Sequence, residues 1–153
     1  MNSREIENLL RTNSDTRHWF RGVYARNRLP TRNNKLYPSA FVVNTDRNDQ
    51  PGEHWVAFYF DENGHGEYFD SYGFPPFHKE FISFLKSYSV KRSTWTHNTI
   101  ALQCTTSKVC GHYCIMYVYF RCKGYTLSEF VSLFDTDVQS NDVLVKDLLE
   151  LLI

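Results

Sequence analysis

Polar and apolar positions divide the first quarter of the chain into a helix and a longer irregular segment. Apolar residues over positions 3–12 recur with helical spacing, and Asn2 together with Glu5 matches a capping box, so we expect a short helix there. Residues 20–38 have no regular pattern and are rich in Arg, Asn and Pro. That composition predicts an extended surface loop.

Strand-like runs occupy the middle of the chain. Three β-branched or aromatic runs, bounded by Asp, Asn, Gly and Pro, predict strands over residues 40–44, 54–60 and 66–72. The apolar spacing over residues 77–88 is helical, and residues 90–96 return to strand composition. We therefore expect a sheet of four strands with one helix between the third and the fourth.

Helical patterns return toward the C-terminal end. Residues 110–122 predict a strongly apolar helix, and Thr126 with Glu129 caps another that reaches Phe134. The segment from Asn141 onward is also helical. Because helices cluster at the two ends and strands lie between them, the pattern predicts an α+β fold rather than alternating βαβ units.

The composition is that of one globular domain over residues 1–153. A chain of this length removes about 70% of its unfolded surface from water, which is enough for a core without disulfides or metal. The 42% hydrophobic share and the low counts of 7 Gly and 5 Pro exclude disorder as the main state. A polar beginning and the lack of any apolar run near 20 residues predict a chain that is neither secreted nor membrane-spanning.

Charge is unevenly distributed although the formal net charge is zero. Residues 1–35 carry eight basic and three acidic side chains, an excess of +5 that the rest of the chain balances. A neutral chain is not expected to act mainly by coating nucleic acid. We interpret the basic segment as a solvated surface, with a contact to DNA or another polyanion as the alternative.

The four cysteines lie in one short stretch of the chain. Pairing them would close only small loops, so we expect free thiols in a reducing compartment. Their gaps match no common zinc-ligand spacing, and no metal site is predicted. Cys104, Cys114 and Cys122 are interpreted as buried packing thiols.

Cys110 differs from the other cysteines in its position. It precedes Gly111 at the start of a predicted helix, where the helix dipole favours a thiolate over a thiol. A thiolate that attacks a carbonyl needs a group to accept and return a proton, and histidine has a suitable pKa. His54, which opens a predicted strand, is the best placed of the six histidines. The alternatives are a packing cysteine and a core histidine.

Turn length decides whether a carboxylate can reach that histidine. A three-residue turn over residues 62–64 would set Val56 opposite Asp70. His54 and Asp70 would then be diagonal neighbours on one sheet face, with backbones about 7 Å apart. The alternative for Asp70 is a carboxylate that bonds a turn amide.

The same chemistry needs donors for an oxyanion. The backbone N–H of Cys110 at a helix start supplies one. Gln103 lies seven residues upstream of Cys110, so its carboxamide is a candidate for a second donor.

These residues occur in an order that is similar to a known family. The set is His54-Trp55, Asp70 with Gly73-Phe74, Gln103 and Cys110-Gly111, preceded by Phe20–Tyr24 and Leu29-Pro30. Over roughly residues 20–122 the chain resembles the adenovirus-type (adenain-like) cysteine proteases, whose clan includes the proteases that remove SUMO and ubiquitin-like proteins.

The resemblance implies a papain-like α+β fold, with a central, mostly antiparallel sheet packed against the helix that carries the nucleophile. It implies Cys110 as nucleophile, His54 as general base and acid, Asp70 as orienting carboxylate and Gln103 as oxyanion donor. The substrate-binding residues it implies are Trp55, Gly111 and Tyr24.

The implied function is cysteine endopeptidase activity that processes structural or precursor proteins of a virus or virus-like mobile element. The gap from Gln103 to Cys110 and the Val109 before the nucleophile match the viral type, whereas Asp70-Ser71 matches the deconjugating type. A deconjugating protease of SUMO or ubiquitin-like modifiers is the alternative. An acyltransferase of the clan and a non-catalytic binding module are more remote.

The resemblance also bears on cofactors and partners. The sequence itself requires no cofactor, but the family implies activation by DNA or by a peptide. We expect a polypeptide substrate, no membrane partner, a monomer, and a location in the host nucleus, the cytoplasm or the virion.

Overall fold

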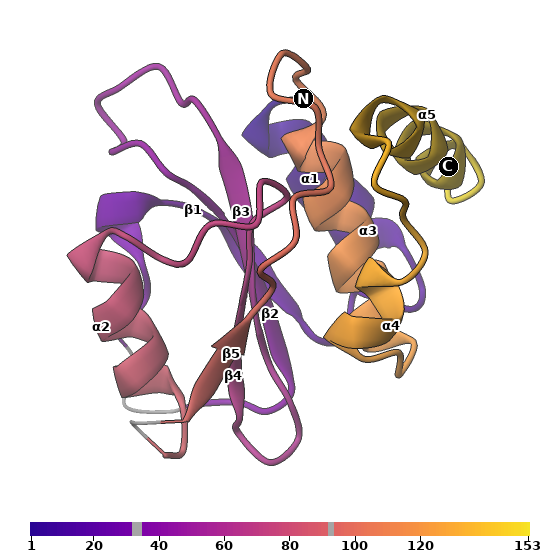
Figure 1. The fold of residues 1–153 in the computed structure, drawn as a ribbon. Coiled ribbons are helices and arrows are strands. Elements are labelled where there is room, and N and C mark those ends of the chain that lie inside the picture. Colours follow the sequence, from indigo (N-terminus) through magenta and orange to yellow (C-terminus); the bar gives the residue numbers. More distant parts are fainter. Residues whose placement is uncertain (32–34, 92–93) are drawn as a thin grey trace.

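The computed structural model describes residues 1–31, 35–91 and 94–153, and it contains a five-stranded sheet in the order β1-β2-β3-β4-β5 (Figure 1). The strands are β1 (Phe20–Ala25), β2 (Ser39–Asn44), β3 (Trp55–Phe60), β4 (Gly66–Phe69) and β5 (Trp95–His97). The three central strands pair antiparallel, and β1 and β5 each add a parallel strand at an edge. The α+β class is confirmed, and the sheet is mixed rather than mostly antiparallel.

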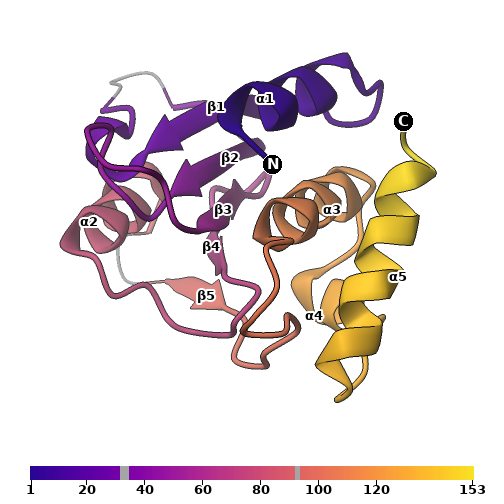
Figure 2. The ribbon, with the colours of Figure 1, turned by 90° about the horizontal axis from the view of Figure 1, so that it is seen from above.

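Helices cover both faces of the sheet, as Figure 2 shows. They are α1 (Ser3–Thr12), α2 (Lys79–Tyr88), α3 (Cys110–Cys122), α4 (Leu127–Val131) and α5 (Val138–Glu150), with a 3₁₀ turn, η1, at Arg26–Arg28. Helix α2 packs on one face, while α3, with α1, α4 and α5 around it, packs on the other. Among the described residues, no helix has the length and apolar character needed to cross a bilayer.

Alternation along β2 and β3 separates two cores. Ala40, Val42 and Ala57 face α3, and their small side chains leave room for the large aromatic residues of that helix. Phe41 and Phe58 point to the opposite face, where they pack with the aromatic residues of α2. Both faces of the central strands are therefore buried, which makes the sheet a rigid support for residues at its ends.

The predicted loop over residues 20–38 is wrong in its first part, because Phe20–Ala25 forms β1. The strand pairs in parallel with β2, and its register shifts between Phe20 and Gly22. Gly22 has a φ of 146°, which is rarely accessible to other residues. This irregularity and the arginine-rich composition hide the strand from a period-two pattern.

Other element boundaries shift at their ends. The helices over residues 3–12 and 110–122 are confirmed at their predicted limits. The strand predicted over residues 66–72 stops at Phe69, and the one predicted over residues 90–96 begins only at Trp95, with residues 92 and 93 outside the described part.

The later helices also differ from the pattern. Helix α2 begins at Lys79 rather than at residue 77. Helix α4 ends at Val131 rather than at Phe134. Helix α5 begins before Asn141, because the side chain of Asp137 accepts hydrogen bonds from two backbone N–H groups of its first turn.

A buried ion pair connects the sheet to α3. Glu67 on β4 accepts hydrogen bonds from Tyr117 and from Nε of Arg121 at 3.0 Å. The guanidinium of Arg121 also lies 4.4 Å from the ring centroid of Tyr59. The Arg121 and Glu67 side chains are only 13% and 9% exposed, so each charge depends on the other.

We expect Glu67→Ala to lower the free energy of unfolding by about 3 kcal/mol, because it leaves the Arg121 charge buried without its partner. Urea denaturation followed by circular dichroism measures the change. Glu62→Ala, at an exposed position on the neighbouring turn, is the matched control and should change it by less than about 0.5 kcal/mol. Equal stability of the two variants would contradict this role of the pair.

Candidate active site

Three ends of secondary structure bring the predicted site residues together. His54 directly precedes β3, Asp70 directly follows β4, and Cys110 is the first residue of α3. Because α3 packs on the sheet with its N-terminal end beside the start of β3, the thiol of Cys110 lies 3.5 Å from the backbone nitrogen of Trp55.

The predicted register between β3 and β4 is confirmed. Ala57 pairs with Phe69, which continues to a pairing of Val56 with Asp70 beyond the last paired residues. Nε2 of His54 lies 2.8 Å from Oδ1 of Asp70. With the carboxylate ionised, Nε2–H donates this bond, and Nδ1 is the ring nitrogen left for the thiol side of the imidazole.

The electrostatics favour a charged Cys110–His54 pair. Burial lowers the pKa of His54, but the hydrogen bond to Asp70 and the contact with Cys110 outweigh it and raise the pKa to about 9. Burial raises the pKa of Cys110, but the contact with His54 and the backbone N–H groups of Trp55 and Gly111 bring it below its usual value. The thiolate and imidazolium forms therefore stabilise each other.

Asp70 is held by the side chain of Asn98, which no sequence motif pointed to, and by the backbone of Tyr72. Oδ1 of the buried Asn98 accepts from the backbone N–H of Asp70 at 3.1 Å, and its Nδ2 donates to the Asp70 carbonyl at 2.6 Å. The backbone N–H of Tyr72 donates to the carboxylate at 2.9 Å. A polar residue directly after a strand was the only sequence signal for Asn98.

The ring of Tyr72 covers one face of the His54 imidazole. The two ring centroids are 4.8 Å apart and the planes differ by 22°. This stacking fixes the ring plane of His54, which the hydrogen bond to Asp70 alone would leave free to rock.

Gln103 is buried close to the loop that leads to Cys110, with 2% of its surface exposed. Its Oε1 accepts from the hydroxyl of Ser71 at 2.6 Å, and its Nε2 donates to the carbonyl and hydroxyl of Ser107 at 3.2 and 3.1 Å. The amide N–H groups thus donate to Ser107. An oxyanion role for Gln103 stays a prediction, and it requires Ser107 to release these N–H groups.

A cleft opens over these residues. Its cavity of about 530 Å³ is lined by His54, Trp55, Tyr72, Ser107 and Cys110, among others.

A second cavity of about 700 Å³ adjoins the cleft, and both Tyr24 and Trp55 line it. Gly111 lies beneath Trp55: a Cβ placed on it would be 3.3 Å from Cδ1 of that indole. Of the three residues predicted to bind substrate, Trp55 and Tyr24 line cavities, whereas Gly111 permits the close packing of Trp55.

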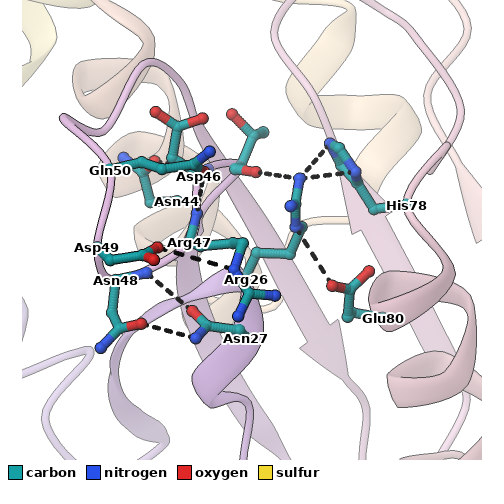
Figure 3. Close-up of polar contacts among 11 residues, drawn as sticks. Arg26, Asn27, Asn44, Asp46, Arg47, Asn48, Asp49, Gln50, His78 and Glu80 are labelled. Atoms are coloured by element: carbon teal, nitrogen blue, oxygen red, sulfur yellow. Dashed lines mark hydrogen bonds and ion pairs between the residues drawn. The ribbon is translucent and has the colours of Figure 1, made fainter.

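The loop over residues 45–53 forms a wall of the second cavity and leads directly to His54. Arg26 anchors its base: Nη1 donates to the Thr45 carbonyl at 3.0 Å, and Nε lies 3.4 Å from Glu80 on α2. Figure 3 shows this network, in which the side chains of Asn27 and Asn48 also bond at 2.6 Å. No pattern in the sequence predicts these contacts.

The other three cysteines are free, like Cys110. Burial raises the pKa of Cys114 well above its usual value and that of Cys122 to about 12. Within the ranges the structure describes, no three His, Cys, Asp or Glu side chains are grouped so as to hold a metal ion.

The family model and the curated relatives that match the sequence agree on one family. Residues 20–132 match the model of the adenovirus endoprotease family. The chain is 33% identical over 89 residues to a protease of Snake adenovirus serotype 1, and 28% identical over 124 residues to a protease of Bovine adenovirus 7. These regions cover 51% and 72% of this chain but only 44% and 60% of the relatives.

Two solved protein structures have a fold similar to that of this chain. The pS273R protease of ASFV superposes with a TM-score of 0.50 at 27% identity, over 69% of this chain and 43% of that one. The SUMO protease Ulp1 superposes with a TM-score of 0.54 at 15% identity, over 95% of this chain and 75% of that one. At that identity, the likeness to Ulp1 shows a shared fold.

Proposed function

The chain belongs to the adenovirus endoprotease family, and from that membership we propose that it is a cysteine endopeptidase that hydrolyses peptide bonds through a thioester. The observation that carries the proposal is the arrangement of His54 between Asp70, at 2.8 Å, and the Cys110 thiol, whose pKa is lowered by that contact and by backbone N–H groups.

The residues support a two-step reaction. Sγ of Cys110 bonds to the substrate carbonyl carbon, and the carbonyl electron pair moves to oxygen. When the intermediate collapses, the C–N bond breaks and His54 gives its proton to the leaving amine. Water then attacks the thioester, passes a proton to His54 and releases the acid and the thiolate. Asp70 holds the imidazole throughout.

The oxyanion is proposed to bind at the start of α3. The backbone N–H of Cys110 has no helical partner and is available. The carboxamide of Gln103 joins it when the hydroxyl and carbonyl of Ser107 release Nε2 on substrate binding.

Replacing Gln103 with alanine is expected to lower kcat/KM on a peptide by about 100-fold, because one donor to the oxyanion is lost. Steady-state kinetics measure the fall, with the unfolding midpoint recorded to confirm a folded variant. Gln139→Ala changes the same residue type at an exposed position on α5, outside the two cavities, and should keep at least half of the activity. Full activity in Gln103→Ala would reject the donor assignment.

The substrates are proposed to be structural or precursor proteins of a virus or virus-like element, as membership of this family favours. Profiling on a peptide library tests this: cleavage of unfolded peptides at a consistent site supports an endopeptidase. Hydrolysis restricted to fusions of SUMO or ubiquitin-like proteins would instead support a deconjugating protease, an alternative favoured by the fold shared with Ulp1.

Stimulation by DNA is proposed from the basic character of residues 1–35. Arg4, Arg17 and Arg28 are exposed, whereas Arg21 and Arg26 are engaged in contacts within the protein. Rates that rise with DNA at low salt and return to the basal value at high salt would support the proposal. Equal rates with and without DNA would reject it, and a peptide activator would then be the one to screen.

The free state of all four cysteines supports a reducing compartment, the nucleus or cytoplasm of a host cell or the virion, as the place of action.

A further inference from the structure

An exposed row of aromatic rings begins at the candidate active site. Tyr72 stacks on His54, the ring of Phe74 lies 6.5 Å from that of Tyr72, and the ring of Phe77 lies 6.0 Å from that of Phe74. Phe74 is 53% exposed and Phe77 is 73% exposed. We call Tyr72, Phe74 and Phe77 the aromatic row.

The segment that carries the row is held firmly. Gly73 has a φ of 76°, and a Cβ there would lie 2.7 Å from the backbone of Ile100. The backbone N–H of Leu102 donates to the Ser71 carbonyl at 2.8 Å. Pro75 and Pro76 restrict the backbone between the two phenylalanines. Two phenyl rings that are exposed to water add nothing to the stability of this rigid segment. Exposed apolar side chains that lie next to each other are typical of a binding surface.

The position of the row identifies the part of the substrate that reaches it. His54 gives its proton to the leaving amine, so the substrate residues that follow the scissile bond lie on the imidazole side of the cleft. Tyr72 lies against that imidazole and lines the same cavity as Cys110. The row therefore continues the cleft on the leaving-group side.

The spacing of the rings matches an extended peptide. Alternate side chains of a β-strand lie about 6.6 Å apart on one face, and the rings of the row are 6.5 and 6.0 Å apart. The row presents no charged side chain of its own, so apolar side chains fit it best.

We propose that the aromatic row binds the substrate segment that follows the scissile bond and selects apolar side chains at alternate positions of that segment. The inference rests on the proposed endopeptidase function and adds a specificity surface to it.

Two peptides that share the same residues before the scissile bond test the proposal. One has leucine at alternate positions after the scissile bond, and the other has serine at the same positions. The folded parent protein is expected to cleave the leucine peptide with a kcat/KM higher by on the order of tenfold, the effect of burying about two such side chains in part. In Phe77→Ser, and more strongly in Phe74→Ser with Phe77→Ser, this ratio should fall toward one.

The matched control is Val143→Ser, which removes an exposed apolar side chain on α5 and should leave the ratio unchanged. If the parent cleaves both peptides equally, or if the ratio persists in the double variant, the proposed role of the aromatic row is overturned. The proposed endopeptidase function is unaffected by that result. A parent that cleaves no peptide at all would overturn the proposed function and the row with it. A dimer that Phe77→Ser converts to monomers in light scattering would show a self-association surface instead and would also overturn the proposal.

Discussion

Cys110→Ala is expected to lower kcat/KM on any cleavable peptide by roughly 10⁴-fold or more, because the sulfur that attacks the carbonyl and forms the thioester is lost. The substitution removes one sulfur atom at the start of α3, and alanine is a good helix former, so the variant should stay folded. Steady-state hydrolysis, with circular dichroism of the same sample, measures the effect.

Cys104→Ala is the matched control for the loss of a thiol. Cys104 lies on the loop before α3 and contacts Thr106 rather than a histidine, so this variant should retain most of the parent rate. Turnover by Cys110→Ala at more than about 1% of the parent rate would exclude the thiolate mechanism.

His54→Ala is expected to have two effects that appear in separate measurements. Turnover should fall by roughly 10⁴-fold, because the proton acceptor and donor is lost. The pKa of Cys110 should also rise toward its ordinary value, because the contact with His54 lowers it in the parent. Alkylation by iodoacetamide, followed from pH 5 to 10, measures the second effect without any substrate.

The directions of these two pKa shifts predict how the activity and the alkylation rate of the parent depend on pH. The pKa of Cys110 is lowered, so the thiolate already forms at pH values below the usual pKa of a thiol. The pKa of His54 is raised to about 9, so the imidazolium that protonates the leaving amine is lost only as the pH rises through about 9. Activity should therefore fall above pH 9. Alkylation of the parent should stay fast at pH values below those at which the thiol of His54→Ala becomes reactive.

His18→Ala removes an exposed histidine and serves as the control. It should leave both the turnover and the alkylation profile unchanged. Coinciding alkylation curves for the parent and His54→Ala would mean that His54 does not activate the thiol.

The geometry of the site was predictable where local rules decide it. The three-residue turn over residues 62–64 fixes the register of β3 and β4, and that register sets His54 and Asp70 on one face of the sheet within reach of each other. The capped helix α1 and the start of α3 at Cys110 also follow from local sequence.

Contacts between distant segments were not predictable in this way. Asn98 reaches Asp70 across 28 residues, and the hydroxyl of Ser71 reaches the amide oxygen of Gln103 across 32. Strand β1 depends on hydrogen bonds to β2, and the arginine- and asparagine-rich residues that follow it in the sequence indicate a loop. Tertiary pairing decides each of these features.

The acyl-enzyme gives the most direct test of the central claim, that Cys110 attacks peptide carbonyls with the help of His54. The parent protein is mixed with an activated ester of a cleavable peptide, quenched in acid within seconds and examined by mass spectrometry. We expect a mass increase equal to the acyl part of the peptide, mapped to Cys110 and missing in Cys110→Ala. Product release without any adduct, or an adduct on Cys104, Cys114 or Cys122, would contradict it.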